Sequence, residues 1–201
     1  GESDGVFDSQ DYILFYAEGI DNWNAENQTN LNLYADKSYY YVTAKGDDGK
    51  RITNYNQPTA AATTTITTFD AYQFHEVDEE NVAKLGRVWF GEQFSNNNEQ
   101  EFEFNFPNLV TSVPVRFDIH LVSASATTTT FSAEANSQTI GSYTFPALNS
   151  SSSIEAYNYT IKNSVAVSSD DITVKITYDN NGVPSSKGLL DYIRIRAKRN
   201  L

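Results

Sequence analysis

The chain contains no cysteine and no methionine, and each absence excludes something. Without cysteine there can be no disulfide, no thiolate metal ligand and no cysteine nucleophile within these 201 residues. Without methionine the natural start codon is missing, which predicts a piece excised from a longer protein. No apolar run approaches the roughly 20 residues that a membrane-spanning helix needs, and no signal peptide is recognisable.

Basic residues are also scarce. The 14 Lys and Arg residues face 26 Asp and Glu residues, which gives a formal net charge of −12. Such a field repels phosphate backbones and anionic lipid, so it argues against nucleic acid as a partner. A hydrophobic content of 39%, with 13% aromatic residues, is enough for a packed core and argues against general disorder.

Strict alternation of apolar and polar residues predicts strands with one buried face. This alternation occurs in Glu101–Phe106, Val115–Leu121, Ile172–Tyr178 and Ile193–Ala197. In the last of these segments the basic residues are expected to point outward. Shorter apolar or β-branched runs predict further strands at Tyr12–Ala17, Leu31–Tyr34, Tyr39–Thr43, Thr64–Phe69, Arg87–Phe90, Ala126–Ala135, Thr139–Phe145 and Tyr157–Ile161.

One short helix is expected at Asp78–Leu85. Asp78 can cap its first N–H groups, two glutamates follow at the positive end of the helix dipole, and Gly86 can close it. Many short strands with closely spaced turns, and no alternation of strands with helices, predict an all-β, jelly-roll-like antiparallel β-sandwich with this one helix. No linker divides the sequence, so residues 1–201 are predicted to form a single domain.

The acidic start of the chain is a candidate calcium site. Glu2, Asp4, Asp8 and Asp11 have the spacing of part of a calcium loop, and Gly5 permits a sharp turn. The first ligand of such a loop would precede Gly1, and a solvated acidic turn before a strand is the alternative. No other cofactor is expected.

Two further features are candidate interaction sites. Trp23 lies among amides and could stack on a sugar ring, or it could close one end of a sandwich or meet a neighbouring domain. Arg194, Arg196 and Lys198 form a basic stripe in an acidic chain. The stripe is either a solvated strand face or a docking surface for an acidic patch on an adjacent domain.

His75 and His120 are the only histidines. They lie 45 positions apart in the sequence, and no serine or carboxylate motif links them. A zinc site needs three or four converging ligands and a hydrolytic triad needs an activated nucleophile. Both histidines are therefore interpreted as surface or hydrogen-bonding residues, and the chain is predicted not to be an enzyme.

Five segments of the sequence also resemble segments of a known protein family. They are Gly1–Gly19, Tyr34–Thr43, Phe74–Phe94, Phe104–Val110 and Gly188–Leu201. In this order they resemble the N-terminal β-sandwich region of the gingipain-like (peptidase family C25), PorU-type sortases of type IX secretion.

The resemblance implies an accessory role. The family's Cys–His pair lies on a caspase-like domain, and no position here matches that motif. The resemblance implies a bacterial protein at the cell surface, associated with the outer membrane or secreted, whose catalytic domain follows this region. The implied partners are that adjacent domain of the same polypeptide and proteins of the secretion system. The chain departs from the family at Leu189, where the family often has tryptophan.

Two other functions stay open at this point. A carbohydrate-binding jelly-roll module would also have a final strand like Leu190–Ile195 and would use loop aromatics and structural calcium. A stand-alone enzyme is the third alternative, and the missing nucleophile argues against it.

Overall fold

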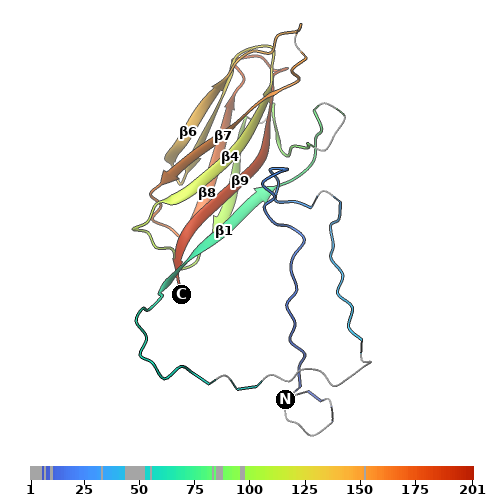
Figure 1. The fold of residues 1–201 in the computed structure, drawn as a ribbon. Coiled ribbons are helices and arrows are strands. Elements are labelled where there is room, and N and C mark those ends of the chain that lie inside the picture. The colour runs from blue at the N-terminus through green and yellow to red at the C-terminus, as the bar shows by residue number, and fades with distance from the viewer. Residues whose placement is uncertain are drawn as a thin grey trace. The chain divides into compact units, whose positions relative to one another are not determined.

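The strands of the computed structural model lie in the later part of the chain (Figure 1). The structure describes residues 6, 8–9, 11–32, 34–43, 53–54, 56–82, 84, 88–95, 98–151 and 153–201. The strands are β1 (Thr68–Glu76), β2 (Gln93–Phe94), β3 (Glu99–Asn105), β4 (Val115–Ala124), β5 (Thr129–Ala135), β6 (Gln138–Phe145), β7 (Tyr157–Val165), β8 (Asp171–Asp179) and β9 (Lys187–Asn200).

The strands form two antiparallel sheets. One has the order β1-β9-β4-β7, with β2 paired to β9, and the other has the order β3-β8-β5-β6. Apart from the short β2 and the β5–β6 hairpin, each strand is followed by one in the opposite sheet. This is a jelly-roll arrangement, so the predicted all-β sandwich is confirmed.

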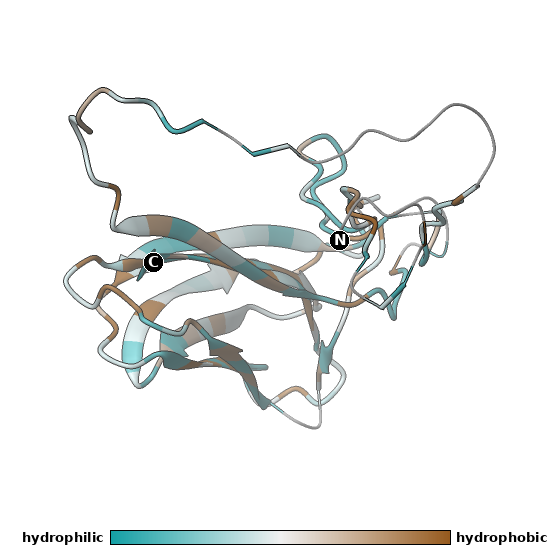
Figure 2. Cartoon of the chain, turned by 90° about the horizontal axis from the view of Figure 1, so that it is seen from below, coloured by the Kyte–Doolittle hydropathy of each residue, from teal (hydrophilic) through white to brown (hydrophobic). Residues whose placement is uncertain are grey.

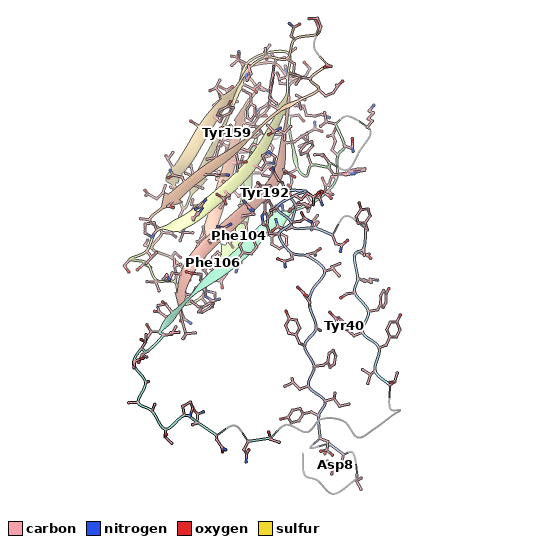
Figure 3. The ribbon with its side chains drawn as sticks, in the orientation of Figure 1. Asp8, Tyr40, Phe104, Phe106, Tyr159 and Tyr192 are labelled. Atoms are coloured by element: carbon pink, nitrogen blue, oxygen red, sulfur yellow. The ribbon has the colours of Figure 1, made fainter. Side chains whose placement is uncertain are left out.

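The core lies between the two sheets. Its inner faces carry the apolar rows that alternation predicted, and Figure 2 shows hydrophobic and hydrophilic bands alternating along the strands. Phe104 and Phe106, labelled in Figure 3, belong to one such row on and just after β3. The rings of Phe117, Phe131 and Phe145 are fully buried. Burying one such side chain contributes about 1.5–3 kcal/mol, so these rows are the main source of stability.

One buried hydroxyl in this core is expected to cost stability. Tyr178 is 1% exposed and packs on Phe131 with ring centroids 4.5 Å apart, but its Oη has no hydrogen-bond partner within the described residues. An unpaired buried hydroxyl costs about 1–3 kcal/mol. We therefore expect Tyr178→Phe to raise the free energy of unfolding by about 1 kcal/mol.

Urea denaturation measures the effect of Tyr178→Phe, and Tyr192→Phe is the matched control. The Tyr192 hydroxyl makes a hydrogen bond with Thr160, so its removal should destabilise the fold. A destabilised Tyr178→Phe variant would contradict the interpretation of an unpaired hydroxyl.

The predicted helix at Asp78–Leu85 is wrong. The described residues of this segment form a turn and an isolated bridge between Glu80 and Phe90, and Lys84 has a positive φ of 54°. A peptide this short gains too few hydrogen bonds to form a helix alone, and pairing with Phe90 satisfies its backbone instead. A separate finding concerns membranes: the described residues include no helix that is long and apolar enough to cross one.

Several predicted strands are also wrong. The described residues of Tyr12–Ala17, Leu31–Tyr34 and Tyr39–Thr43 form no strand, and the first sheet strand begins at Thr68, close to the end of the predicted Thr64–Phe69. Local β propensity alone does not make a strand, because a ladder also needs a neighbouring backbone.

The chain divides into two units, Gly1–Asn56 and Gln57–Leu201. The sandwich belongs to the second unit. In the first unit, the side chain of Asn24 accepts hydrogen bonds from the backbone N–H groups of Glu26 and Asn27, and Asn24 pairs with Thr29 to close a turn. That both units act as one accessory domain stays a prediction.

Candidate functional site

The acidic turn that was predicted to bind calcium lies only partly within the described residues. Glu2 and Asp4 are outside them. Asp8, labelled in Figure 3, donates its backbone N–H to Asp11 Oδ2 at 3.3 Å, and Asp11 donates its backbone N–H to the Asp8 carbonyl at 3.1 Å. The described part of the chain contains no group of three or more metal-ligating side chains. The calcium site therefore stays a prediction.

The predicted interaction residues lie in different environments. Trp23 is half-buried in the first unit. Arg196 is exposed, and Lys198 pairs with the exposed Asp70 at 3.1 Å. Arg194 differs from both, because its side chain is 7% exposed and forms an ion pair with Asp118. The basic residues are thus not one uniform stripe, and their role in docking stays a prediction.

A row of buried polar side chains lies on the outer face of the five-stranded sheet. We call it the polar row and define it as Asp118, His120, Asp191 and Arg194. Asp118 and His120 project from β4, on the face opposite the core row of Phe117, Ile119 and Leu121. Each member of the polar row is at most 9% exposed.

A β-bulge brings Asp191 into the polar row. The register between β4 and β9 shifts between His120 and Leu121: His120 pairs with Tyr192, whereas Leu121 pairs with Leu190. Asp191 is the extra residue. Because Leu190 and Ile193 both belong to the core, Asp191 and Tyr192 must both lie on the outer face. The bulge thereby places a carboxylate beside His120.

The polar row is arranged for charge pairing. Arg194 Nη2 donates to Asp118 Oδ2 at 3.1 Å, and the register places Lys162 of β7 on the other side of Asp118. The Arg194 guanidinium lies 4.8 Å from the centroid of the Tyr192 ring. Burial raises the pKa of the Tyr192 hydroxyl, and the nearby Arg194 charge offsets part of this effect. The row therefore holds opposite charges together in a place with little water.

His120 and Asp191 of the polar row are arranged like the histidine and aspartate of a hydrolytic triad, but the third member, a nucleophile, is not beside them. His120 Nδ1 donates to Asp191 Oδ2 at 2.5 Å, which would fix the ring as an aspartate does in a triad. However, Nε2 lies 3.3 Å from Asn158 Oδ1, and an amide oxygen is not a nucleophile. This geometry suits a structural hydrogen-bond network better than acid–base catalysis. The interpretation of His120 as a hydrogen-bonding residue is confirmed.

The other histidine also pairs with a carboxylate. His75 Nε2 donates to Glu92 Oε1 at 2.6 Å, and the ring of His75 lies 4.7 Å from that of Phe102. Burial alone would raise the pKa of Glu92, but the hydrogen bond from His75, aided by a backbone hydrogen bond and the charge of His75, outweighs it and lowers the pKa. This pair ties β1 to the segment that leads into β2.

The His75–Glu92 pair predicts a pH-dependent contribution to stability. A carboxyl group whose pKa is lower in the folded state stabilises the fold above its unfolded pKa, near 4.5, and the contribution disappears as the pH falls through the folded pKa. Glu92→Gln should therefore lower the melting temperature by about 2–4 °C at pH 7, corresponding to about 1 kcal/mol. The difference from the parent should vanish toward pH 3–4.

Thermal melts followed by circular dichroism test this prediction for Glu92, and Glu99→Gln is the matched control. Glu99 pairs with Lys175 at 3.3 Å but is 59% exposed, so its loss should change the melting temperature little. A Glu92→Gln difference that is the same at pH 4 and pH 7 would show that the charge of Glu92 is not responsible.

Sequence reasoning missed the partners of these residues. It placed Asp118 and His120 on an outward face but did not foresee their burial, nor their pairing with Arg194 and Asp191 more than 70 positions away. One signal was present. Between the core residues Leu190 and Ile193 stand two residues instead of one, a spacing that indicates a bulge.

The fold was compared with known proteins. No protein-family model and no curated protein matches the sequence. Among solved structures, dimeric latent PorU from Porphyromonas gingivalis is similar, with a TM-score of 0.60 and 20% identity. The similarity covers 73% of this chain but only 14% of the PorU chain.

Carbohydrate-binding modules are also similar, but more distantly. A CBM36 module of a xylanase from the hindgut metagenome of Trinervitermes trinervoides has a TM-score of 0.39 and 13% identity, and covers 62% of this chain and 96% of its own. A CBM36 in complex with calcium and xylotriose has a TM-score of 0.39 and 12% identity, and covers 65% and 99%. The likeness to PorU confirms the predicted resemblance at the level of the fold: this chain has a β-sandwich of the kind found in PorU.

Proposed function

We propose that this chain is a non-catalytic accessory domain of a larger gingipain-like, PorU-type peptidase or sortase. The observation that carries the proposal is the fold likeness to PorU. The likeness covers 73% of this chain but only 14% of the PorU chain. A region that matches so small a share of a larger chain suits one part of a multidomain protein. The parent protein would process secreted proteins at the bacterial cell surface.

The residues available in this chain favour a structural, non-catalytic role. It has no cysteine, and both histidines are held by carboxylates within or beside the five-stranded sheet. The proposed partner is the adjacent catalytic domain of the same polypeptide, with proteins of the secretion system as further partners. Arg196 is the exposed basic residue of β9 that is available for an acidic patch on that domain.

The test is made on the parent gene and its product. We expect the sequence beyond Leu201 to encode a caspase-like domain with a histidine and a cysteine. The parent protein should hydrolyse peptides, and the 201-residue chain alone should not. Removing residues 1–201 should reduce the yield or activity of the parent, whereas replacing the catalytic cysteine should abolish activity and leave folding intact.

Two results would overturn this proposal. One is peptide hydrolysis by the 201-residue chain alone. The other is a parent gene without a peptidase domain, combined with retention of the chain on a glycan affinity gel that is lost in Trp23→Ala. The second result would identify a carbohydrate-binding module instead.

We also propose that the acidic turn binds calcium in the parent protein, with Glu2, Asp4, Asp8 and Asp11 as ligands. In a chain extended by its ten preceding native residues, Ca²⁺ should raise the melting temperature, since an ion that binds only the folded state stabilises it. Asp4→Ala should abolish the shift, whereas Asp36→Ala, outside the turn, should preserve it. No shift in the extended parent chain would remove the proposal.

A further inference from the structure

The two outer faces of the sandwich differ in charge. Charged residues that alternate with core residues along a strand point outward. On the four-stranded sheet they are one cation, Lys175, and six carboxylates: Glu99, Glu101, Glu103, Glu134, Asp171 and Asp179. The five-stranded sheet instead has five cations against four carboxylates, and the cations are Arg116, Lys162, Arg194, Arg196 and Lys198. All of these strands belong to the second unit, so its basic charge is gathered on one face.

Two arginines stand directly opposite each other on the basic face. We call Arg116 of β4 and Arg196 of β9 the arginine pair, because they are cross-strand partners in the ladder. Strand β9 lies between β1 and β4 (Figure 1), and the other neighbour of Arg196 in the register is Tyr72 of β1. The other neighbour of Arg116 is Ser164 of β7. Like charges placed directly opposite each other destabilise a sheet, and no carboxylate in this row offsets them.

The next row of the sheet does not neutralise the arginine pair. Its carboxylate is Asp118, which already accepts a hydrogen bond from Arg194 at 3.1 Å. Arg116 Nε reaches Asp118 Oδ1 only at 3.5 Å, which is long for a hydrogen bond between charged groups. Lys162 stands opposite Asp118 on β7 and adds a further cation. The two rows therefore hold four cations against one carboxylate.

The unbalanced charge is local to these two rows. Two positions further along β9, Lys198 stands opposite Asp70 and pairs with it at 3.1 Å. In contrast, neither Arg196 nor Lys162 forms an ion pair with a described residue. The basic residues of β9 thus differ in kind: Lys198 has its own carboxylate, whereas Arg196 faces another arginine.

The arginine pair suits a carboxylate from another molecule. Neighbouring strands lie about 4.8 Å apart, so one carboxylate above the sheet can accept hydrogen bonds from both guanidinium groups. A guanidinium group matches a carboxylate better than an ammonium group does, because its planar fork donates two parallel hydrogen bonds. Such a carboxylate would also remove the repulsion between Arg116 and Arg196.

The charge of the whole chain indicates what carries that carboxylate. A net charge of −12 repels extended anionic surfaces such as membranes and nucleic acids. A carboxylate on a projecting protein segment meets mainly the local field, because charges more than about 10 Å apart are largely screened at 0.1 M salt. An acidic protein segment is therefore the partner that these charges favour.

We propose that the arginine pair is a docking site for an acidic segment of a partner protein. One glutamate or aspartate carboxylate of that segment is held between Arg116 and Arg196, and Lys162 adds attraction from β7. The identification of the partner as the adjacent domain of the same polypeptide rests on the proposed function. The binding of an acidic segment does not, and it can be measured on the 201-residue chain without the parent protein.

Fluorescence anisotropy with a labelled hexaglutamate peptide tests the docking site. At about 0.1 M salt, where the distant negative charges are screened, we expect a Kd below about 1 mM. Arg116→Gln and Arg196→Gln should each weaken binding about tenfold or more, because each removes one side of the carboxylate site. Lys198→Gln is the matched control on the same face of β9. It should weaken binding less than about threefold, since Asp70 already neutralises Lys198.

Three binding results would overturn the proposal. The first is no binding of hexaglutamate by the parent chain, or equal binding of hexaglutamine. The second is an Arg196→Lys variant that binds as tightly as the parent, because a diffuse positive field needs no planar fork, whereas the proposed site should lose about fivefold. The third is tighter binding of inorganic phosphate, or of phosphatidylserine vesicles, than of hexaglutamate, which would identify a phosphate or membrane site instead.

Thermal melts separate a binding role from a structural one. Because Arg196 opposes Arg116, Arg196→Gln should raise the melting temperature by about 1–3 °C at low salt, and the gain should shrink at high salt. Lys198→Gln should give no gain, since it breaks the contact with Asp70. A lower melting temperature for Arg196→Gln would show that the arginine is held for the stability of the sheet, and would overturn the proposal.

Discussion

Gly188→Val is expected to lower the free energy of unfolding by more than about 4 kcal/mol, a large share of the 5–15 kcal/mol typical of a whole domain. A Cβ at this position would lie 2.5 Å from Phe131 Cζ and 2.9 Å from two ring carbons of Tyr178. Neither ring can move aside easily, because Phe131 is fully buried and packs edge-on against Phe94 and Phe145. Only a residue without a side chain fits β9 at this point.

Urea denaturation compares Gly188→Val with two controls. Gly141→Ala adds a Cβ that meets only Ile161 Cγ2, at 3.0 Å, so it should cost less than about 1 kcal/mol. Phe131→Leu removes the Cζ atom that the new side chain of Gly188→Val would strike, so the double variant Gly188→Val, Phe131→Leu should lose less than the sum of the two single variants. Strict additivity, or a Gly188→Val loss as small as that of Gly141→Ala, would show that this region repacks freely.

Much of the sandwich was predictable because its inner rows alternate strictly. Strands β3, β4, β8 and the last part of β9 follow that pattern, since a half-buried strand must place every second residue in the core. The pattern failed at the start of the chain. Tyr12–Ala17 has the same local composition, but a ladder depends on a second backbone, and the sequence of one segment does not specify it.

The candidate site was less predictable than the fold. The outward residues Asp118 and His120 read as solvent-facing, because alternation separates the two faces of a strand but does not say what covers the outer one. Their partners lie on β9, and the bulge at Asp191 sets the contact with His120. Such pairing depends on the register between two strands, and the alternation of residues within a single strand does not determine that register.

The second large expected loss of stability comes from a substitution in the polar row. Asp118→Ala is expected to lower the free energy of unfolding by about 3–5 kcal/mol, because it removes the carboxylate that pairs with the buried Arg194 guanidinium. The two side chains are 4% and 7% exposed, and they are direct cross-strand neighbours on β4 and β9. The exposed Arg116, whose Nε lies 3.5 Å from Asp118 Oδ1, loses a partner as well but can turn to water.

Asp70→Ala is the matched control, since it removes another cross-strand carboxylate opposite a basic residue of β9. Asp70 is 82% exposed and lies 3.1 Å from Lys198, so its loss should cost less than about 0.5 kcal/mol. The double variant Asp118→Leu, Arg194→Met replaces the buried pair with apolar residues and should recover most of the loss of Asp118→Ala. If Asp118→Ala instead costs as little as Asp70→Ala, the pair is solvated in the native protein, and the polar row is an open surface rather than a structural network.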